Sequence, residues 1–333
     1  MRRFSVVAIA AIVAALVAYT GYWFYMASEL RTGTLRWAEA ARAGGRSLAW
    51  EEMAVDGYPL AFRISLRNAV LGGAQPLPYE VAVATLIGKA RPWDLQRWRL
   101  TAPGGFKSVM PGGPETVTVD GLDGSLVLGK GTVVDLVGHG VSTAGLVSGL
   151  RADRIAVRLT LPEHPPQQHG DTAVATTIEL DQATLPAAVP PFGSTIETLS
   201  LDGAFKGAVP SGPLHQALEA WRADGGTIEL QQGTLRWGAL SLTANGTVAL
   251  DEALQPLAAF TATIENHNAI VDAAVANGGL KAANANAVKL VLGLLAKPGP
   301  DGKKRLTVPV SIQNERLYLG PAQIAVLPPI TWK

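Results

Sequence analysis

The chain has 333 residues, with 28 Lys and Arg against 27 Asp and Glu, a formal net charge of +1, and no Cys. This near-neutral charge offers no basic face to nucleic acid, and the lack of cysteine excludes disulfide bonds and thiolate chemistry. With 36 Gly, 22 Pro and only 17% charged residues, the composition is typical of a water-facing protein with many turns and an apolar β structure.

An uncharged stretch opens the chain: Phe4 to Ser28 lies between Arg3 and Glu29. A helix of this length, at about 1.5 Å per residue, crosses a hydrocarbon core of about 30 Å, so residues 1–28 are predicted to form a transmembrane anchor. Arg2 and Arg3 predict a cytoplasmic start. Amphipathic rings at the far end are expected at the outer headgroup level, and these are Tyr19, Tyr22, Trp23, Phe24 and Tyr25.

A cleaved signal peptide is the alternative, because a basic start before an apolar run is also its signature. The run is longer than the usual signal core of about 7–15 residues, and bulky aromatics occupy the place of a small-x-small cleavage site. We therefore favour a single-pass protein of the bacterial inner membrane, with its N-terminus in the cytoplasm and its bulk in the periplasm. The inner membrane is then its first expected partner.

After the anchor, residues 29–45 are predicted to be a helical stalk, because Leu30, Thr34, Trp37, Ala38 and Ala41 recur at helical spacing. Gly44 and Gly45 end it. The stalk is expected to lift the following domain off the bilayer or to lie along the bilayer edge. Residues 46–333 are predicted to form one β-rich domain, with a sub-boundary near 186–192 left open.

The clearest strand is Pro59 to Arg67, where apolar and polar residues alternate, after a turn at Asp56-Gly57. Its inward face is predicted to hold Leu60, Phe62, Ile64 and Leu66. Other strands are predicted at 48–55, 80–87, 115–119, 125–128, 132–137, 154–161, 172–180, 240–244, 247–250, 305–313, 316–319 and 323–326. A break is expected at Pro186 to Pro191. Asp120-Gly121 and Asp202-Gly203 are interpreted as turns, and Asn245-Gly246 as a hairpin turn.

Helices are expected near Pro213 to Arg222, with Ser211 as cap and Gly225-Gly226 as stop, and over Ala269 to Ala296, split at Gly278-Gly279. No alternation of strands with helices suggests parallel pairing. The fold class predicted is mostly β with minor α: an N-terminal transmembrane helix followed by a large curved antiparallel sheet with a few packed helices.

Several phrases along the chain resemble domain-of-unknown-function family 2125. They are Asp56-Gly57-Tyr58-Pro59-Leu60-Ala61-Phe62-Arg63, Leu235-Arg236-Trp237 leading to Thr243-Ala244-Asn245-Gly246, and Leu319-Gly320-Pro321 with Leu327-Pro328-Pro329. The resemblance implies a bacterial envelope protein with no assigned activity. These motifs are turns and strand edges, so they carry no catalytic residue across. In architecture alone the chain is also similar to AsmA-like lipid-handling proteins.

A search for reactive groups finds little. Ser148 lacks the glycine of a nucleophile elbow, Gly138-His139-Gly140 does not continue as a dinucleotide loop, and Gly105-Phe106-Lys107-Ser108 breaks the spacing of a phosphate loop. His164 and His169, with Asp171 nearby, have an unusual spacing for zinc, so a solvated loop is favoured over a metal site. His267 is interpreted as a turn or helix-start residue rather than a general base. His139 and His215 stand alone.

No catalytic, cofactor-binding or metal-binding residue is therefore predicted, no cofactor is expected, and an enzyme is disfavoured. The first functional hypothesis is a structural or interaction module of the envelope, docking a protein partner through an edge strand or the region of Trp37 and Trp50. The alternative is a protein that binds or transfers a lipid or other apolar ligand on its sheet, partly covered by the helices of 269–296. Arg63 and Arg67 are interpreted as solvating the outer sheet face, with anionic headgroups as the other option.

Overall fold

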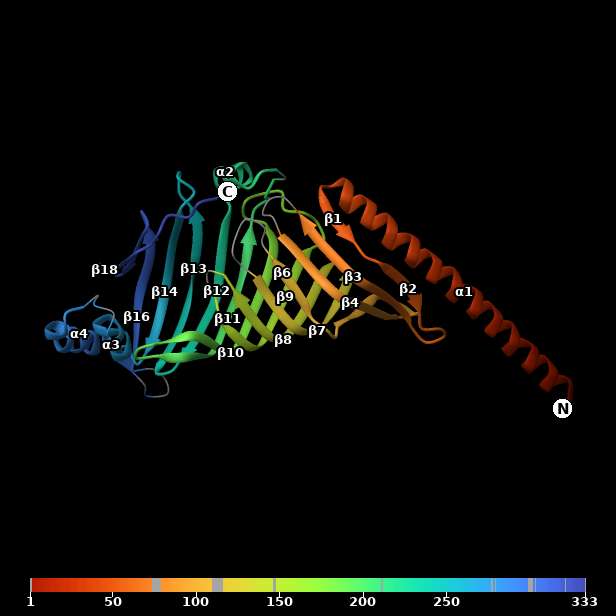
Figure 1. Ribbon diagram of the computed structural model, residues 1–333, viewed down its shortest axis with the longest axis horizontal. Coiled ribbons are helices and arrows are strands. Elements are labelled where there is room, and N and C mark those ends of the chain that lie inside the picture. The colour runs from red at the N-terminus through yellow and green to blue at the C-terminus, as the bar shows by residue number, and fades with distance from the viewer. Residues whose placement is uncertain are drawn as a thin grey trace.

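The structure is a computed structural model that describes residues 2–73, 79–109, 116–145, 148–210, 212–276, 278, 280–298, 302, 304–320 and 322–332. In these residues eighteen strands form one antiparallel sheet, with helices at its two ends and along one margin (Figure 1). The predicted fold class is confirmed.

Helices and strands have the following bounds. The helices are α1 (Arg2–Ala43), α2 (Leu214–Ala223), α3 (Asn268–Ala276) and α4 (Ala282–Leu295). The strands are β1 (Arg46–Ala49), β2 (Glu52–Asp56), β3 (Phe62–Gly73), β4 (Tyr79–Arg91), β5 (Asp94–Ala102), β6 (Phe106–Val109), β7 (Thr116–Gly129), β8 (Gly131–Ala144), β9 (Arg151–Pro162), β10 (Thr172–Val189), β11 (Gly193–Lys206), β12 (Thr227–Trp237), β13 (Leu240–Leu250), β14 (Pro256–Glu265), β15 (Lys297–Pro298), β16 (Lys304–Gln313), β17 (Arg316–Leu319) and β18 (Ala322–Val326).

The sheet is a meander in which strands pair with close neighbours in the sequence. From β7 to β14 each strand pairs with the next one, and β14 then pairs with β16 across α3 and α4. At two places in the sheet, two short strands lie end to end where one long strand would otherwise be. β1 and β2 both pair with β3, and β5 and β6 both lie between β4 and β7. The range 186–192 falls at the turn between β10 and β11, which pair along their length.

Helix α1 is continuous from Arg2 to Ala43 and, by length and composition, is a candidate membrane span over Ile9–Ala43. Its second half corresponds to the predicted stalk, but it is packed on the sheet. It contacts β1 and β2, Ala38 is fully buried, and Arg42 Nε donates a hydrogen bond of 2.7 Å to the carbonyl of Leu48. The predicted stalk is therefore not a free spacer but the part of α1 that packs against β1 and β2.

Three of the predicted turns lie inside strands. Asn245-Gly246 is in the middle of β13, Asp202-Gly203 is in β11, and Asp120-Gly121 is in β7, which joins the two strands predicted at 115–119 and 125–128; residue 115 itself lies outside the described part. Gly246 has a packing role, since a Cβ there would approach the Phe260 ring to 2.5 Å. A glycine inside a strand permits such close approach without any turn.

Two predicted boundaries also differ. Leu60 is in the turn before β3 and is 69% exposed, so it is not part of the inward face, whereas Phe62 is fully buried. The break expected from Pro186 starts later, because β10 continues to Val189. Pro186 lies beyond Thr184, the last residue of β10 that pairs with β9, so its missing N–H removes no hydrogen bond from that ladder.

The predicted helices form, but not where the lipid-binding hypothesis placed them. α2 ends before Gly225, as predicted, and Ser211 and Gly279 lie outside the described residues. α3 and α4 lie beyond the last strands of the sheet, where α4 contacts β16 (Figure 1). They lie in the chain between β14 and β15, and β15 pairs with β16, which keeps them at that end. They therefore lie beside the end of the sheet at β14 and β16, where Ile264 and Leu306 are buried, and not over its middle.

Candidate functional site: the apolar face of the sheet

One face of the sheet is apolar across almost every strand. Following the register from β3 to β16, a central row of residues is made only of aliphatic side chains and glycine: Ile64, Gly88, Leu100, Gly124, Leu136, Val157, Ile178, Leu201, Gly233, Ala244, Ala262 and Val308. With strands about 4.8 Å apart, this row is about 50 Å long.

The rows on either side have the same character. One contains Ala102, Leu122, Gly138, Ile155, Leu180, Leu199, Leu235, Leu242, Ile264 and Leu306. The other contains Phe62, Ala90, Trp98, Leu126, Val134, Leu159, Thr176, Gly203, Leu230, Gly246, Phe260 and Val310, with one threonine as its polar member. We call these three rows together the apolar face.

In the middle of the sheet the apolar face is half-buried. The large side chains from β7 to β13 are neither closed off from solvent nor fully exposed, and they include Leu126, Leu136, Val157, Ile178, Leu201 and Leu235. A sheet face covered by a second layer of structure would hold fully buried side chains instead. The apolar face therefore presents accessible apolar surface over most of its length.

The sheet bends toward its apolar face. At the bend Gly140 and Gln182 flank Asp153 of β9, and both have a positive φ, 63° and 50°. A positive φ reverses the alternation of side chains at that point. Beyond it, a buried cluster forms from Val119, Val141, Ala152 and Ala183, which are 0–5% exposed, and it is packed against Ile155 and Leu180 of the apolar face. Side chains from both sides of the bend thus meet on this face, which makes it the concave one.

The opposite face is polar and carries the ion pairs of the central strands. One of its rows reads Arg63, Lys89, Arg99, Ser125, Asp135, Arg158, Thr177, Asp202 and Gln232. Arg158 Nε is 2.5 Å from Asp135 Oδ1, and this hydrogen bond raises the pKa of Arg158. Arg154 donates to Asp181 at 2.8 Å, which raises its pKa in the same way. A hollow of about 330 Å³ lies among these residues, and its lining combines charged side chains with Leu136, Val137, Ala156 and Val157.

Helix α1 covers the apolar face at one end. Trp23 is 3% exposed, stacks on Phe62 with 5.1 Å between ring centroids, and donates a hydrogen bond of 3.1 Å to the carbonyl of Ala61. Met26, Leu30 and Val55 pack around this pair. Trp23 is therefore part of the protein core, where it joins α1 to the sheet.

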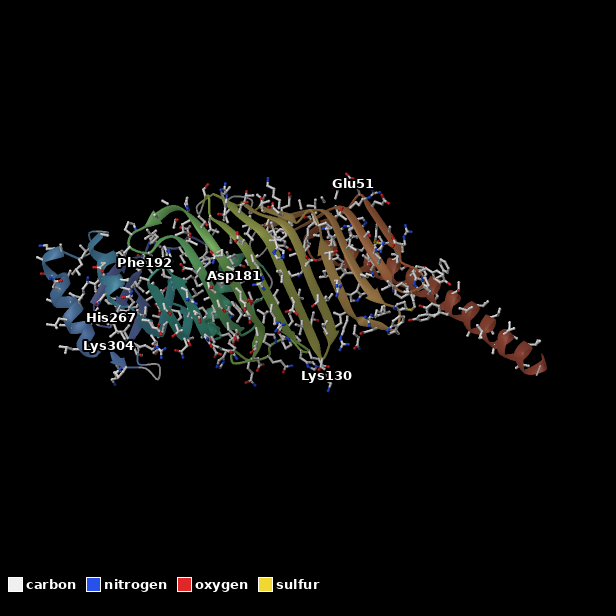
Figure 2. The ribbon with its side chains drawn as sticks, turned by 90° about the horizontal axis from the view of Figure 1, so that it is seen from below. Glu51, Lys130, Asp181, Phe192, His267 and Lys304 are labelled. Atoms are coloured by element: carbon white, nitrogen blue, oxygen red, sulfur yellow. The ribbon has the colours of Figure 1, made fainter. Side chains whose placement is uncertain are left out.

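The candidate catalytic residues do not converge. His139 is exposed on β8, His215 is on α2 with Nδ1 3.6 Å from Glu219, and His267 is buried at the end of the sheet far from α1 (Figure 2). Gly138-His139-Gly140 is part of β8, Gly105 leads into strand β6 rather than a helix, and Ser148 is an exposed loop residue. Within the described part of the chain, no three His, Asp or Glu side chains gather closely enough to hold a metal ion.

His164 and His169 lie in the connection between β9 and β10, where Asp171 has a structural role. Asp171 Oδ2 accepts hydrogen bonds from the backbone N–H groups of Gln167 and Gln168 at 2.9 and 3.0 Å. These two bonds hold the pKa of Asp171 below its ordinary value. The carboxylate thus orders the loop, as side chains of aspartate commonly do in turns.

Other residues singled out in the sequence are accounted for locally. Arg63 pairs with Asp56 at 3.2 Å, and Arg67 pairs with Glu52, both between β2 and β3 on the polar face. Trp37 is 53% exposed on α1, and Trp50 lies under the guanidinium of Arg42, 5.7 Å from the ring centre. An apolar sheet face was predicted from the sequence, but not which residues form its rows, because alternation within each strand does not reveal which rows adjoin.

The comparisons with known proteins give a family and no characterised relative. No curated protein and no solved structure matches the chain. The profile of one family matches residues 23–328, from the tryptophan that docks α1 on the sheet to the last residues after β18. The chain therefore belongs to the family described as "Uncharacterized protein conserved in bacteria (DUF2125)".

Proposed function

We propose that this protein is anchored in a membrane by α1 and binds the acyl chains of lipids along its apolar face. The observation that supports this most is the central row, which stays apolar for about 50 Å and is half-buried from Ile64 to Leu201. One leaflet of a bilayer contributes about 15 Å of hydrocarbon, so several chains fit end to end. Apolar surface that is open in the free protein and lost from water in the complex favours binding.

The test uses the full-length protein in vesicles of phosphatidylethanolamine and phosphatidylglycerol, with a fraction of the lipid carrying a photoreactive acyl chain. Illumination should attach lipid to peptides of β8 to β12 that contain the central row. Val157→Asp places a charge on this row and should lower the yield on β9 about tenfold, since an ion is poorly accommodated in apolar surroundings.

Thr160→Asp is the matched control, because Thr160 is exposed on the polar face of the same strand. It should leave the yield unchanged, with both variants compared at equal folded fraction by circular dichroism. Attachment confined to α1, or equal yields in the two variants, would overturn the proposal.

A second candidate function is docking of an envelope protein, and the exposed side of α4 favours it. Leu290, Val291, Leu294 and Leu295 are 54–79% exposed at the end of the sheet away from α1. A photoreactive amino acid at Leu294 should crosslink to one partner in cells, whereas the same group at Asn286, which is exposed on the same helix, should not. Equal crosslinking at the two positions would count against docking.

We also propose that the role is non-catalytic, supported by the dispersion of the described histidines. Alanine variants of His139, His164 and His267 should each restore a deletion strain fully. Loss of function in His139→Ala or His164→Ala, which are exposed positions, would contradict this.

A further inference from the structure

The described surface around the first contact of α1 with the sheet is rich in exposed aromatic and aliphatic side chains. Tyr58 and Leu60 of the β2–β3 loop are 46% and 69% exposed, and Trp93 of the β4–β5 turn is 65% exposed. Phe24 and Tyr25 of α1, also exposed at 60% and 63%, lie beside them, with Phe24 stacked on Tyr58 at 5.8 Å. We call these five residues the aromatic collar.

Hydrogen bonds join both loops to the same short part of α1, residues 19–22. Tyr19 donates a hydrogen bond to the carbonyl of Pro59, and Tyr22 donates one of 2.7 Å to the carbonyl of Pro92. Thr20 Oγ1 is 2.7 Å from the hydroxyl of Tyr58. The β2–β3 loop and the β4–β5 turn therefore lie beside residues 19–24 of the helix, and the first part of α1 projects beyond the sheet (Figure 1).

The length of the projecting part decides where the membrane surface falls. Only Phe4 to Ala18, fifteen residues of the apolar stretch, precede the first contact with the sheet at Tyr19. At about 1.5 Å per residue this is about 22 Å, which is about 8 Å short of a hydrocarbon core of about 30 Å. Because α1 is continuous, the next residues, 19–23, must lie at acyl-chain depth, and the two loops lie there with them.

Charge near the collar matches a lipid surface. Lys89 pairs in register with Arg63 and Arg99 on the polar face behind the β4–β5 turn, and Arg91 is exposed at the turn itself. Arg63 has Asp56 as partner, while Lys89, Arg91 and Arg99 have no ion pair within the described part of the chain. Cations just above inserted aromatic residues are the arrangement that anionic headgroups attract.

We propose that the aromatic collar is inserted in the outer leaflet, so that the β2–β3 loop and the β4–β5 turn enter the membrane and Lys89, Arg91 and Arg99 bind anionic phospholipid headgroups. With the collar inserted, the end of the apolar face that lies beside α1 is in direct contact with the bilayer. The insertion rests on α1 as a membrane span and is independent of whether the apolar face binds lipid.

The test exploits the absence of native cysteine. Leu60→Cys in the full-length protein gives a single thiol on an exposed position, which is labelled with an environment-sensitive fluorophore. The protein is placed in nanodiscs of phosphatidylethanolamine and phosphatidylglycerol that contain lipids brominated on the acyl chain. Val13→Cys, in the projecting part of α1, reports full insertion, and Lys130→Cys, exposed at the tip of the β7–β8 hairpin, reports a position in water.

Leu60→Cys should be quenched by brominated lipid to at least half the extent of Val13→Cys, and Lys130→Cys should not be quenched. Combining Lys89→Glu with Arg99→Glu should reduce the quenching at Leu60→Cys about twofold, and replacing phosphatidylglycerol by phosphatidylcholine should have the same effect. Quenching at Val13→Cys alone, or at neither position, would overturn the insertion of the collar. Quenching at Leu60→Cys that is insensitive to both charge changes would overturn the headgroup contact.

Discussion

On the polar face of the central strands Arg158 is bonded to Asp135, whereas its neighbour Val157 belongs to the opposite face and pairs with Leu136 and Ile178. The two faces thus share strands, backbone and register, and differ only in the side chains that point to each side. Arg158 and Arg154 on the polar face of these strands have acidic partners within hydrogen-bond distance. Apolar side chains cannot form ion pairs. The sheet bends toward the apolar face, which buries part of this face at the bend and leaves the rest accessible. The difference shows that a single amphipathic sheet limits its exposed apolar area by curvature.

The largest effect is expected where the apolar face is fully buried. Val141→Asp places an unpaired charge in the cluster at the bend and should destabilise the protein by about 3–5 kcal/mol. Ser142→Asp, the next residue on β8 and half-buried, should cost about 1 kcal/mol or less. Thermal unfolding followed by circular dichroism measures both. Similar losses in the two variants would mean that the bend does not separate a core from a surface.

A smaller effect is expected where α1 covers the apolar face. Trp23→Ala removes the ring stacked on Phe62 and should cost about 3 kcal/mol, because a large buried side chain leaves a cavity. Trp37→Ala, on the same helix but 53% exposed, is the control and should change stability by less than about 1 kcal/mol. Chemical unfolding in detergent compares them, and an equal loss for Trp37→Ala would contradict the docking of α1 through Trp23.

The smallest effect is expected on the polar face. A double-mutant cycle of Arg158→Ala and Asp135→Ala should give a coupling of less than about 1 kcal/mol, since the Arg158 side chain is 62% exposed and water screens the pair. The coupling should fall further in 0.5 M salt. A coupling well above this range would mean that the ion pairs, and not the buried bend, hold the central strands in place.

Alternation within a strand was readable from the sequence wherever the two faces differ strongly. Ile155, Val157 and Leu159 take every second position, between arginine, alanine and threonine, and the predicted strand 154–161 corresponds to β9. Glycine misled the prediction at Gly203 and Gly246, because the same residue permits a turn and permits close packing across strands, and only the partner strand decides between them.

Other features depend on contacts distant in sequence. Gln182 has a positive φ at the bend although glutamine has no preference for that conformation, so nothing local announces it. The composition around Trp23 suits a membrane interface and a protein core equally well. The apolar face as one surface emerges only when the register joins residues such as Val157, Ile178 and Leu201 from separate strands.

The meander also determines how the sheet can be assembled. From β7 to β14 each strand pairs with the next strand along the chain, and the longest connection, between β11 and β12, is the one that contains α2. Each pairing therefore joins segments close in sequence. Strand pairing can therefore start beside α1 and follow the order of synthesis, so that only the most recently added strand is an unpaired edge. An order of this kind suits a chain whose first residues are held in place while the remainder is delivered.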